Sequence, residues 1–201
     1  TYETITLHVH DPTTDTSGTG KSENNSGVSI DIGSMVHWVF VIGDIHKIYK
    51  NGINVYTSDS GKGYATNKLR TSNRIGISNW FGGDAFFKGT IAYLRIWDGT
   101  ALDEREVSML YQDRNIVIGD APYIDGSLKY DLPIYKVTLP SYDWDFRNNT
   151  GTNIVIDQIG GISATPVNGA TSTSEGMTIS DSSQVVNVGA VTFGGEDLTI
   201  E

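Results

Sequence analysis

Two carboxylates near the end of the sequence have a spacing that sugar chemistry could use. In "GEDLTIE", Asp197 and Glu201 stand four positions apart with Thr199 between them, so a strand would place both on one face. Retaining glycoside hydrolases need two carboxylates about 5 Å apart across the sugar. An ordinary strand start has the same composition, and the residue midway between the two acids is not acidic. We therefore predict no enzyme and no catalytic residue.

The four histidines are the next candidates, because imidazole is a common zinc ligand. His8 and His10 would project from one face of a strand, and His37 or His46 would have to complete the site. Zinc needs three or four converging ligands, and nothing in the sequence brings a third one near. With no cysteine in the chain, thiolate metal clusters and thiol nucleophiles are excluded as well.

Calcium is the metal that the sequence leaves open, because it takes oxygen ligands from loops. The candidates are Asp11 and Asp15 in one polar loop, and Asn79 and Asp84 in the loop "SNWFGGDAF". The alternative is that these residues only form turns, as Asp and Asn do in any β protein. We expect no cofactor other than this possible calcium ion.

The second of these loops could also bind a sugar. Trp80 and Phe81, followed by two glycines, would form an aromatic platform for a sugar ring, with Asn79 and Asp84 as polar partners. The alternative is that both rings cap the end of a β structure.

The elements that must position these loops are strands. The 23 Gly, 10 Tyr and 4 Trp of the 201 residues favour strands and tight turns. Residues 4–10 alternate apolar and polar, 35–42 are almost continuously apolar, and 46–57 contain Asn51-Gly52 between two β-prone arms. The polar tract 11–27 predicts a surface loop.

A strand near 88–97 is followed by the one predicted helix, roughly 103–113. The strand places Tyr93, Arg95 and Trp97 on one face. Asp103 and Glu106 have the spacing of a capping box, and apolar residues recur after them at helical spacing. Residues 116–141 hold three of the five prolines and predict a linker, beyond which lie only short β-prone pieces.

The order of these pieces resembles a known family. "VHWVFVIGDIHKIYKNGINV", "RIGIS" and "FFKGTIAYLRIWDGTALDEREVSMLY" are similar to the later part of a laminin-G-like or concanavalin-A-like domain, over residues 28–112. "YDWDFR", "GMTIS", "QVVNVG" and "FGGEDLTIE" resemble the first third of the same fold. The resemblance implies an all-β, antiparallel jelly-roll β-sandwich with one short helix. The family's glycosidases have an acidic strand motif with a middle acid, and this chain has Thr199 instead between Asp197 and Glu201.

The resemblance also implies tandem repeats. Residues 1–115 would be the C-terminal two-thirds of one domain, 116–141 a linker, and 142–201 the N-terminal third of a second domain. Alternatively, residues 142–201 complete the first part in a circularly permuted order, because such a sandwich places its first and last strands side by side.

The net charge of the chain excludes some classes of binding partner. A net charge of −10 and a pI near 4.7 argue against nucleic acid or an anionic membrane as a partner. The resemblance implies an extracellular, cell-surface or virion-surface location. We expect a non-catalytic structural, assembly or adhesion module of a larger protein, whose partners are neighbouring protein chains or domains. The alternative is a calcium-assisted lectin that binds glycans through Asn79, Trp80, Phe81 and Asp84.

Overall fold

The fold consists almost entirely of short antiparallel strands. The computed structural model describes residues 4–10, 21–59, 68–70, 73–77, 87–114, 140–147, 151, 154–167, 169–179, 185–188, 191–193 and 198–201. The strands before the helix are β1 (Thr4–His10), β2 (Lys21–Ser29), β3 (Trp38–Ile42), β4 (Lys47–Lys50), β5 (Ile53–Thr57), β6 (Lys68–Arg70), β7 (Asn73–Ile75), β8 (Gly89–Ile91) and β9 (Tyr93–Asp98). After helix α1 (Glu104–Gln112) come β10 (Tyr142–Asp145), β11 (Val155–Ile156), β12 (Ser163–Val167), β13 (Thr171–Ser172), β14 (Met177–Ile179), β15 (Val185–Val188), β16 (Val191–Phe193) and β17 (Leu198–Ile200).

Two layers of sheet enclose the main core. One layer is a six-stranded sheet in the order β10-β9-β17-β3-β4-β5, and the other contains the sheets β11-β12-β15-β7 and β13-β14-β8. Buried side chains from both layers meet between them, namely Ile42, Ile96, Trp144, Phe146, Val155, Ala164, Ala170, Met177 and Ile179. The predicted all-β sandwich is therefore confirmed.

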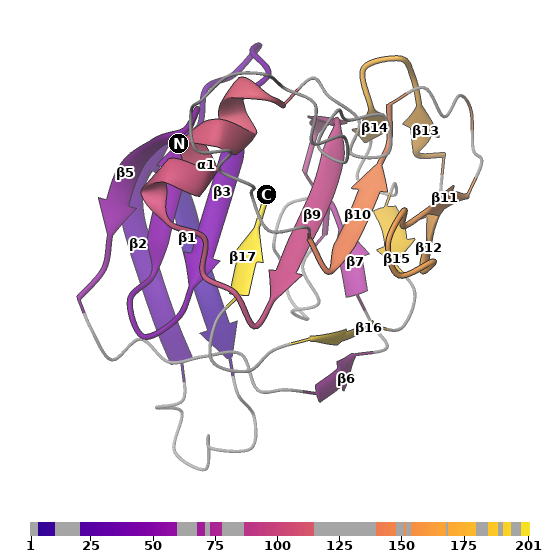
Figure 1. Cartoon of the computed structure of the whole chain (residues 1–201). Coiled ribbons are helices and arrows are strands. Elements are labelled where there is room, and N and C mark those ends of the chain that lie inside the picture. The colour runs from indigo at the N-terminus through magenta and orange to yellow at the C-terminus, as the bar shows by residue number, and fades with distance from the viewer. Residues whose placement is uncertain are drawn as a thin grey trace, which may run out of the picture.

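Helix α1 covers the other face of the six-stranded sheet (Figure 1). Its first turn has the predicted capping box, in which Asp103 accepts from the backbone N–H of Glu106 and the Glu106 side chain accepts from that of Asp103. Val107 and Leu110 point to the sheet and pack in a cluster with Trp97 and Val39. Among the described residues this nine-residue helix is the only one, and it is too short to cross a membrane.

The predicted hairpin forms β4 and β5. Asn51 has a φ of 52° and Gly52 a φ of 78°, the positive values that a type I′ turn needs at both positions. The backbone N–H of Asn51 donates to His37, which ties the turn to the start of β3.

One predicted loop is partly a strand. The tract 11–27 was expected to be a loop, but residues 21–27 belong to β2, which pairs with β1 from Thr4↔Ser29 to His10↔Lys21. Backbone pairing decides the conformation there, because most of β2 is polar and lacks the alternation by which a strand is predicted.

The strands of residues 142–201 interleave with those of the first part. β17 lies between β3 and β9 in the six-stranded sheet, and β10 lies beside β9 (Figure 1). β14 pairs with β8, β15 with β7, and β16 with β6. This is the pairing that the permuted alternative describes. The division into 1–115, 116–141 and 142–201, with a second copy beginning at residue 142, stays a prediction.

The backbones of β14 and β8 approach each other closely where the two parts of the chain meet. Gly176, just before β14, has a φ of 139°, and a Cβ there would lie 2.3 Å from the carbonyl oxygen of Ile91. Only glycine allows β14 to approach the end of β8 so closely.

Candidate functional site

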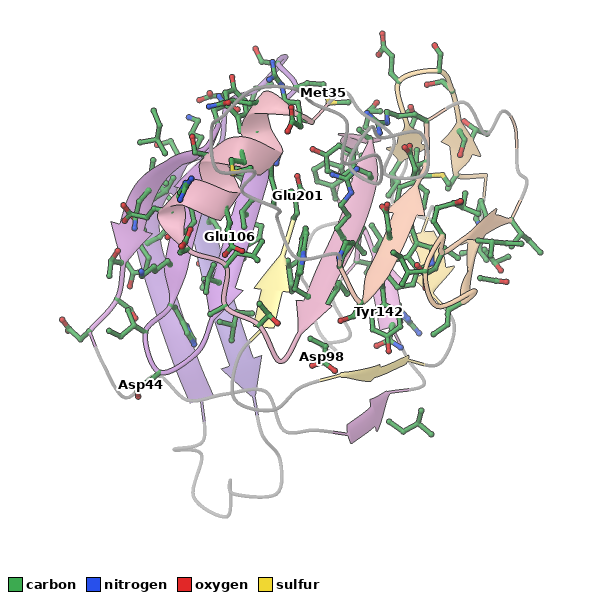
Figure 2. All side chains as sticks on the ribbon, in the orientation of Figure 1. Met35, Asp44, Asp98, Glu106, Tyr142 and Glu201 are labelled. Carbon is green, nitrogen blue, oxygen red and sulfur yellow. The ribbon has the colours of Figure 1, made fainter. Side chains whose placement is uncertain are left out.

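A row of charged side chains crosses the helix-facing side of the six-stranded sheet. Asp143 on β10 lies opposite Arg95 on β9, and the backbone groups of Arg95 and Glu201 exchange two hydrogen bonds. His37, just before β3, completes the row. Figure 2 shows Glu201 at the end of β17, in the middle of this sheet. Pairing of strands that are distant in the sequence therefore places four charged or titratable groups side by side.

Short contacts join the members of the row, which we call the buried charge row (His37, Arg95, Asp143 and Glu201). Nε2 of His37 donates to Oε1 of Glu201 at 2.5 Å, and Nη1 of Arg95 donates to Oε2 of Glu201 at 3.1 Å. Nε of Arg95 donates to Oδ1 of Asp143 at 3.2 Å. Each carboxylate thus has a cationic or hydrogen-bonding neighbour.

Burial and charge act in opposite directions on Glu201. Burial alone would raise the pKa of its carboxyl, but the hydrogen bond from His37 and the charge of Arg95 outweigh it, so the pKa is lowered. Burial likewise opposes the charge of Arg95, yet Glu201 and Asp143 keep the pKa of its guanidinium raised. Both groups are held in their charged forms.

The balance between burial and nearby charges gives raised pKa values for Asp143 and for Tyr93. Burial raises the pKa of Asp143 more than Arg95 lowers it. Burial, followed by the negative charge of Glu201, also raises the pKa of the Tyr93 hydroxyl, which donates to Glu201 at 3.2 Å. The tyrosine therefore stays neutral and acts as a further donor to the carboxylate.

Two guanidinium groups flank the Tyr93 ring. The Cζ atom of Arg95 lies 4.3 Å and that of Arg147 5.0 Å from the ring centroid. Arg147 is itself paired with Asp145 at 2.6 Å, and this pair is only 14% and 10% exposed. The positive charges around the ring are matched by nearby carboxylates, so the cluster has little charge left for an anionic ligand.

This arrangement is suited to holding strands together rather than to proton transfer. A general acid or base must reach a substrate and have a pKa near the working pH. Glu201 is 7% and Asp143 1% exposed, and both carboxylates contact Arg95. Of the predicted carboxylate pair, Glu201 is thus committed to an ion pair, whereas Asp197 lies outside the described residues.

The predicted ligand loops fall outside the described part of the chain. This holds for Asn79, Trp80, Phe81 and Asp84, and also for Asp11 and Asp15. The described residues place the bases of both loops: the N–H of Phe87 donates to the carbonyl of Gly76, and His10 pairs with Lys21. The glycan and calcium assignments stay predictions.

The histidines divide into two groups. His37 and His46 are buried, and His37 contacts Glu201. The side chains of His8 and His10 lie outside the description, although their backbone belongs to β1. Within the described residues, no three or more His, Asp or Glu side chains are grouped so that they could hold a metal ion.

Sequence reasoning missed the buried charge row, although one signal was present. The period of two places Arg95 between Tyr93 and Trp97 on one strand face, and a buried Arg requires an acidic partner. Glu201 could not be identified as this partner, because 105 residues lie between the two and only the sheet order brings them together.

The comparisons with known proteins agree with this fold. Neither the curated proteins nor the solved structures yielded a match. Residues 4–108, just over half of the chain, match the family model Laminin_G_3, described as the concanavalin A-like lectin/glucanases superfamily. A sandwich of two sheet layers, a short helix on one face and this match together lead to one conclusion: the chain belongs to the concanavalin A-like lectin/glucanases superfamily.

Proposed function

We propose that this protein is a non-catalytic structural or adhesion module of a larger extracellular, cell-surface or virion-surface protein, and that it contacts neighbouring protein chains. The observation that carries the proposal is the apolar character of two outer strands. Ile53 on β5 is 68% exposed, and Ile156 on β11 is 54% exposed.

Both strands stand at the edge of their sheet. In the described topology β5 pairs only with β4, and β11 only with β12. Outer strands of soluble proteins usually carry charged residues or proline that prevent pairing with another chain. The outward side chains of β5 are Ile53, Val55 and Thr57, which favours contact with a neighbouring chain.

The buried charge row supports the absence of catalysis. Its carboxylates are buried and ion-paired, and helix α1 packs on the same face of the sheet. This face is therefore occupied by the protein's own side chains.

Sedimentation velocity over a range of concentrations tests the proposal. The wild-type chain should show weak self-association, and the double variant Ile53→Lys/Ile156→Lys should abolish it without changing the fold. A control that adds the same charge at exposed polar positions, Ser34→Lys/Thr171→Lys, should behave as wild type. Equal association of all three chains would refute the role of these edges.

The superfamily description favours a second candidate, a glycan-binding lectin that uses Asn79, Trp80, Phe81 and Asp84, with calcium held there or by Asp11 and Asp15. A glycan array with and without calcium separates the two functions. Reproducible sugar binding that Trp80→Ala abolishes would establish the lectin. Failure of every sugar under both conditions would remove it.

A further inference from the structure

We propose that residues 140–201 can complete a second copy of this chain, so that two modules exchange their C-terminal strands. The proposal rests on the proposed assembly function and names its partner. Five strands of this segment pair with strands of the first part: β10, β14, β15, β16 and β17.

Neither part can bury its core alone. Ile42 and Ile96 from the first part meet Trp144, Phe146 and Met177 from the second in one cluster. Without β17, the edges of β3 and β9 would lack their partner, and Arg95 would lose Glu201. The first part therefore accepts β17 as its missing strand. Residues 140–201 of another copy fit this place as well as those of the same chain.

A single connection joins the two parts, and it is much longer than closure within one chain requires. The Arg114 carbonyl accepts from Arg147, which stacks on Tyr93 at one end of β9, whereas Ser141 bonds to Ile96 and Asp98 at the other end. The gap between Arg114 and Ser141 is thus about the length of β9, roughly 20 Å. About six extended residues can span it.

The connection has 25 residues, 115–139. Fully extended, it would reach about 80 Å, enough to place the segment in an adjacent molecule. A connection of this length gives closure within one chain an effective concentration of roughly millimolar order. Exchange is therefore expected where copies are crowded, as in an assembled surface layer.

Shortening the connection tests the exchange. Deleting residues 116–139 leaves Asn115 alone, which spans about 7 Å and cannot cover the gap. We expect this variant to fold as a dimer, with a twofold higher mass by light scattering. A control in which 115–139 are replaced by Gly/Ser residues of the same number should be monomeric at low concentration.

Cross-linking identifies which strands are exchanged. Ile96 pairs with Ile200 at a position without ladder hydrogen bonds, where the Cα atoms lie close enough for a disulfide. Because the chain has no cysteine, Ile96→Cys and Ile200→Cys introduce the only thiols. Combined in one chain with the natural connection, the two cysteines should form an internal disulfide.

The two cysteines can also be placed on separate chains that both have the shortened connection. When a chain with Ile96→Cys and a chain with Ile200→Cys are refolded together, they should form a covalent dimer. With the natural connection, the cross-linked fraction should rise with protein concentration. A shortened chain that is monomeric and folded, or one that does not fold, would overturn the exchange, as would the absence of a mixed disulfide. None of these results would affect self-association through β5 and β11, so the two proposals fail separately.

Discussion

Glu201 is the residue on which the buried charge row depends most, because it accepts from His37, Arg95 and Tyr93 at once. A carboxylate with three donors can keep its charge in a buried place. The cost of losing it falls on Arg95, whose charge would then have Asp143 as its remaining acidic partner.

We predict that Glu201→Gln lowers the free energy of unfolding at pH 7 by about 3 kcal/mol, because breaking a buried ion pair leaves a buried charge with less compensation. Urea denaturation measures this loss. The matched control Glu175→Gln changes an exposed residue in the turn before β14 and should cost less than about 0.5 kcal/mol. Equal effects of the two variants would refute the role of Glu201.

The pH dependence of stability should show opposite contributions from the two acids. The pKa of Glu201 is lowered by folding, so its stabilisation is present above the unfolded-state value of about 4.3 and is lost as the pH falls below it. The pKa of Asp143 is raised, so its contribution improves as the pH falls towards its folded-state value and below.

We therefore expect Glu201→Gln to lose less stability than wild type between about pH 5 and 3, and Asp143→Asn to lose more. Urea unfolding of the three proteins at several pH values in this window checks the signs. Parallel curves for wild type and both variants would contradict them.

At the scale of elements, helix α1 begins at a capping box. Asp103 accepts from the backbone N–H groups of Arg105 and Glu106, which lie in the first turn, where no helix carbonyl precedes them. We predict that Asp103→Ala lowers the free energy of unfolding by about 1 kcal/mol, whereas Asp103→Ser retains most of the cap. Thermal unfolding followed by circular dichroism measures both, and equal losses would argue against the cap.

The joint between β14 and β8 depends on Gly176. A methyl group there meets the Ile91 carbonyl at 2.3 Å, and the residue has a positive φ. We predict that Gly176→Ala costs about 2 kcal/mol or more. Gly151→Ala is the matched control, because Gly151 also has a positive φ but a Cβ there has open space. A similar loss in both variants would show that backbone strain, not the close approach, decides.

Elements were predictable where the local sequence determines them. The Asn51-Gly52 turn and the helix cap need only neighbouring residues, so both could be read from the sequence. The conformation of β2 depends on pairing with β1, and the position of β17 depends on strands more than 95 residues away. Such contacts leave no local pattern, which is why the buried charge row was missed.

For the whole molecule, the shared core implies that both parts unfold together. Phe146 is fully buried among side chains from both parts. We predict that Phe146→Ala lowers the free energy of unfolding by about 3–5 kcal/mol and reduces hydrogen-exchange protection in β3 and β9 as much as in β14. Phe87→Ala, at a residue 44% exposed, is the control and should have a small effect. Loss of protection confined to the C-terminal segment would contradict a common core.

The buried charge row also selects which strand, and which alignment of it, can occupy the place between β3 and β9. If β17 slipped by one residue, Ile200 would meet His37 and Arg95, and the carboxylate of Glu201 would point into the apolar core. Both changes are costly, because Arg95 would keep only Asp143 as an acidic partner and the buried Glu201 carboxylate would lose its donors. A foreign strand without an acid at this position would be rejected for the same reason. The four residues therefore select both the strand and its register, because only a strand with an acid at this position supplies the carboxylate that His37 and Arg95 contact.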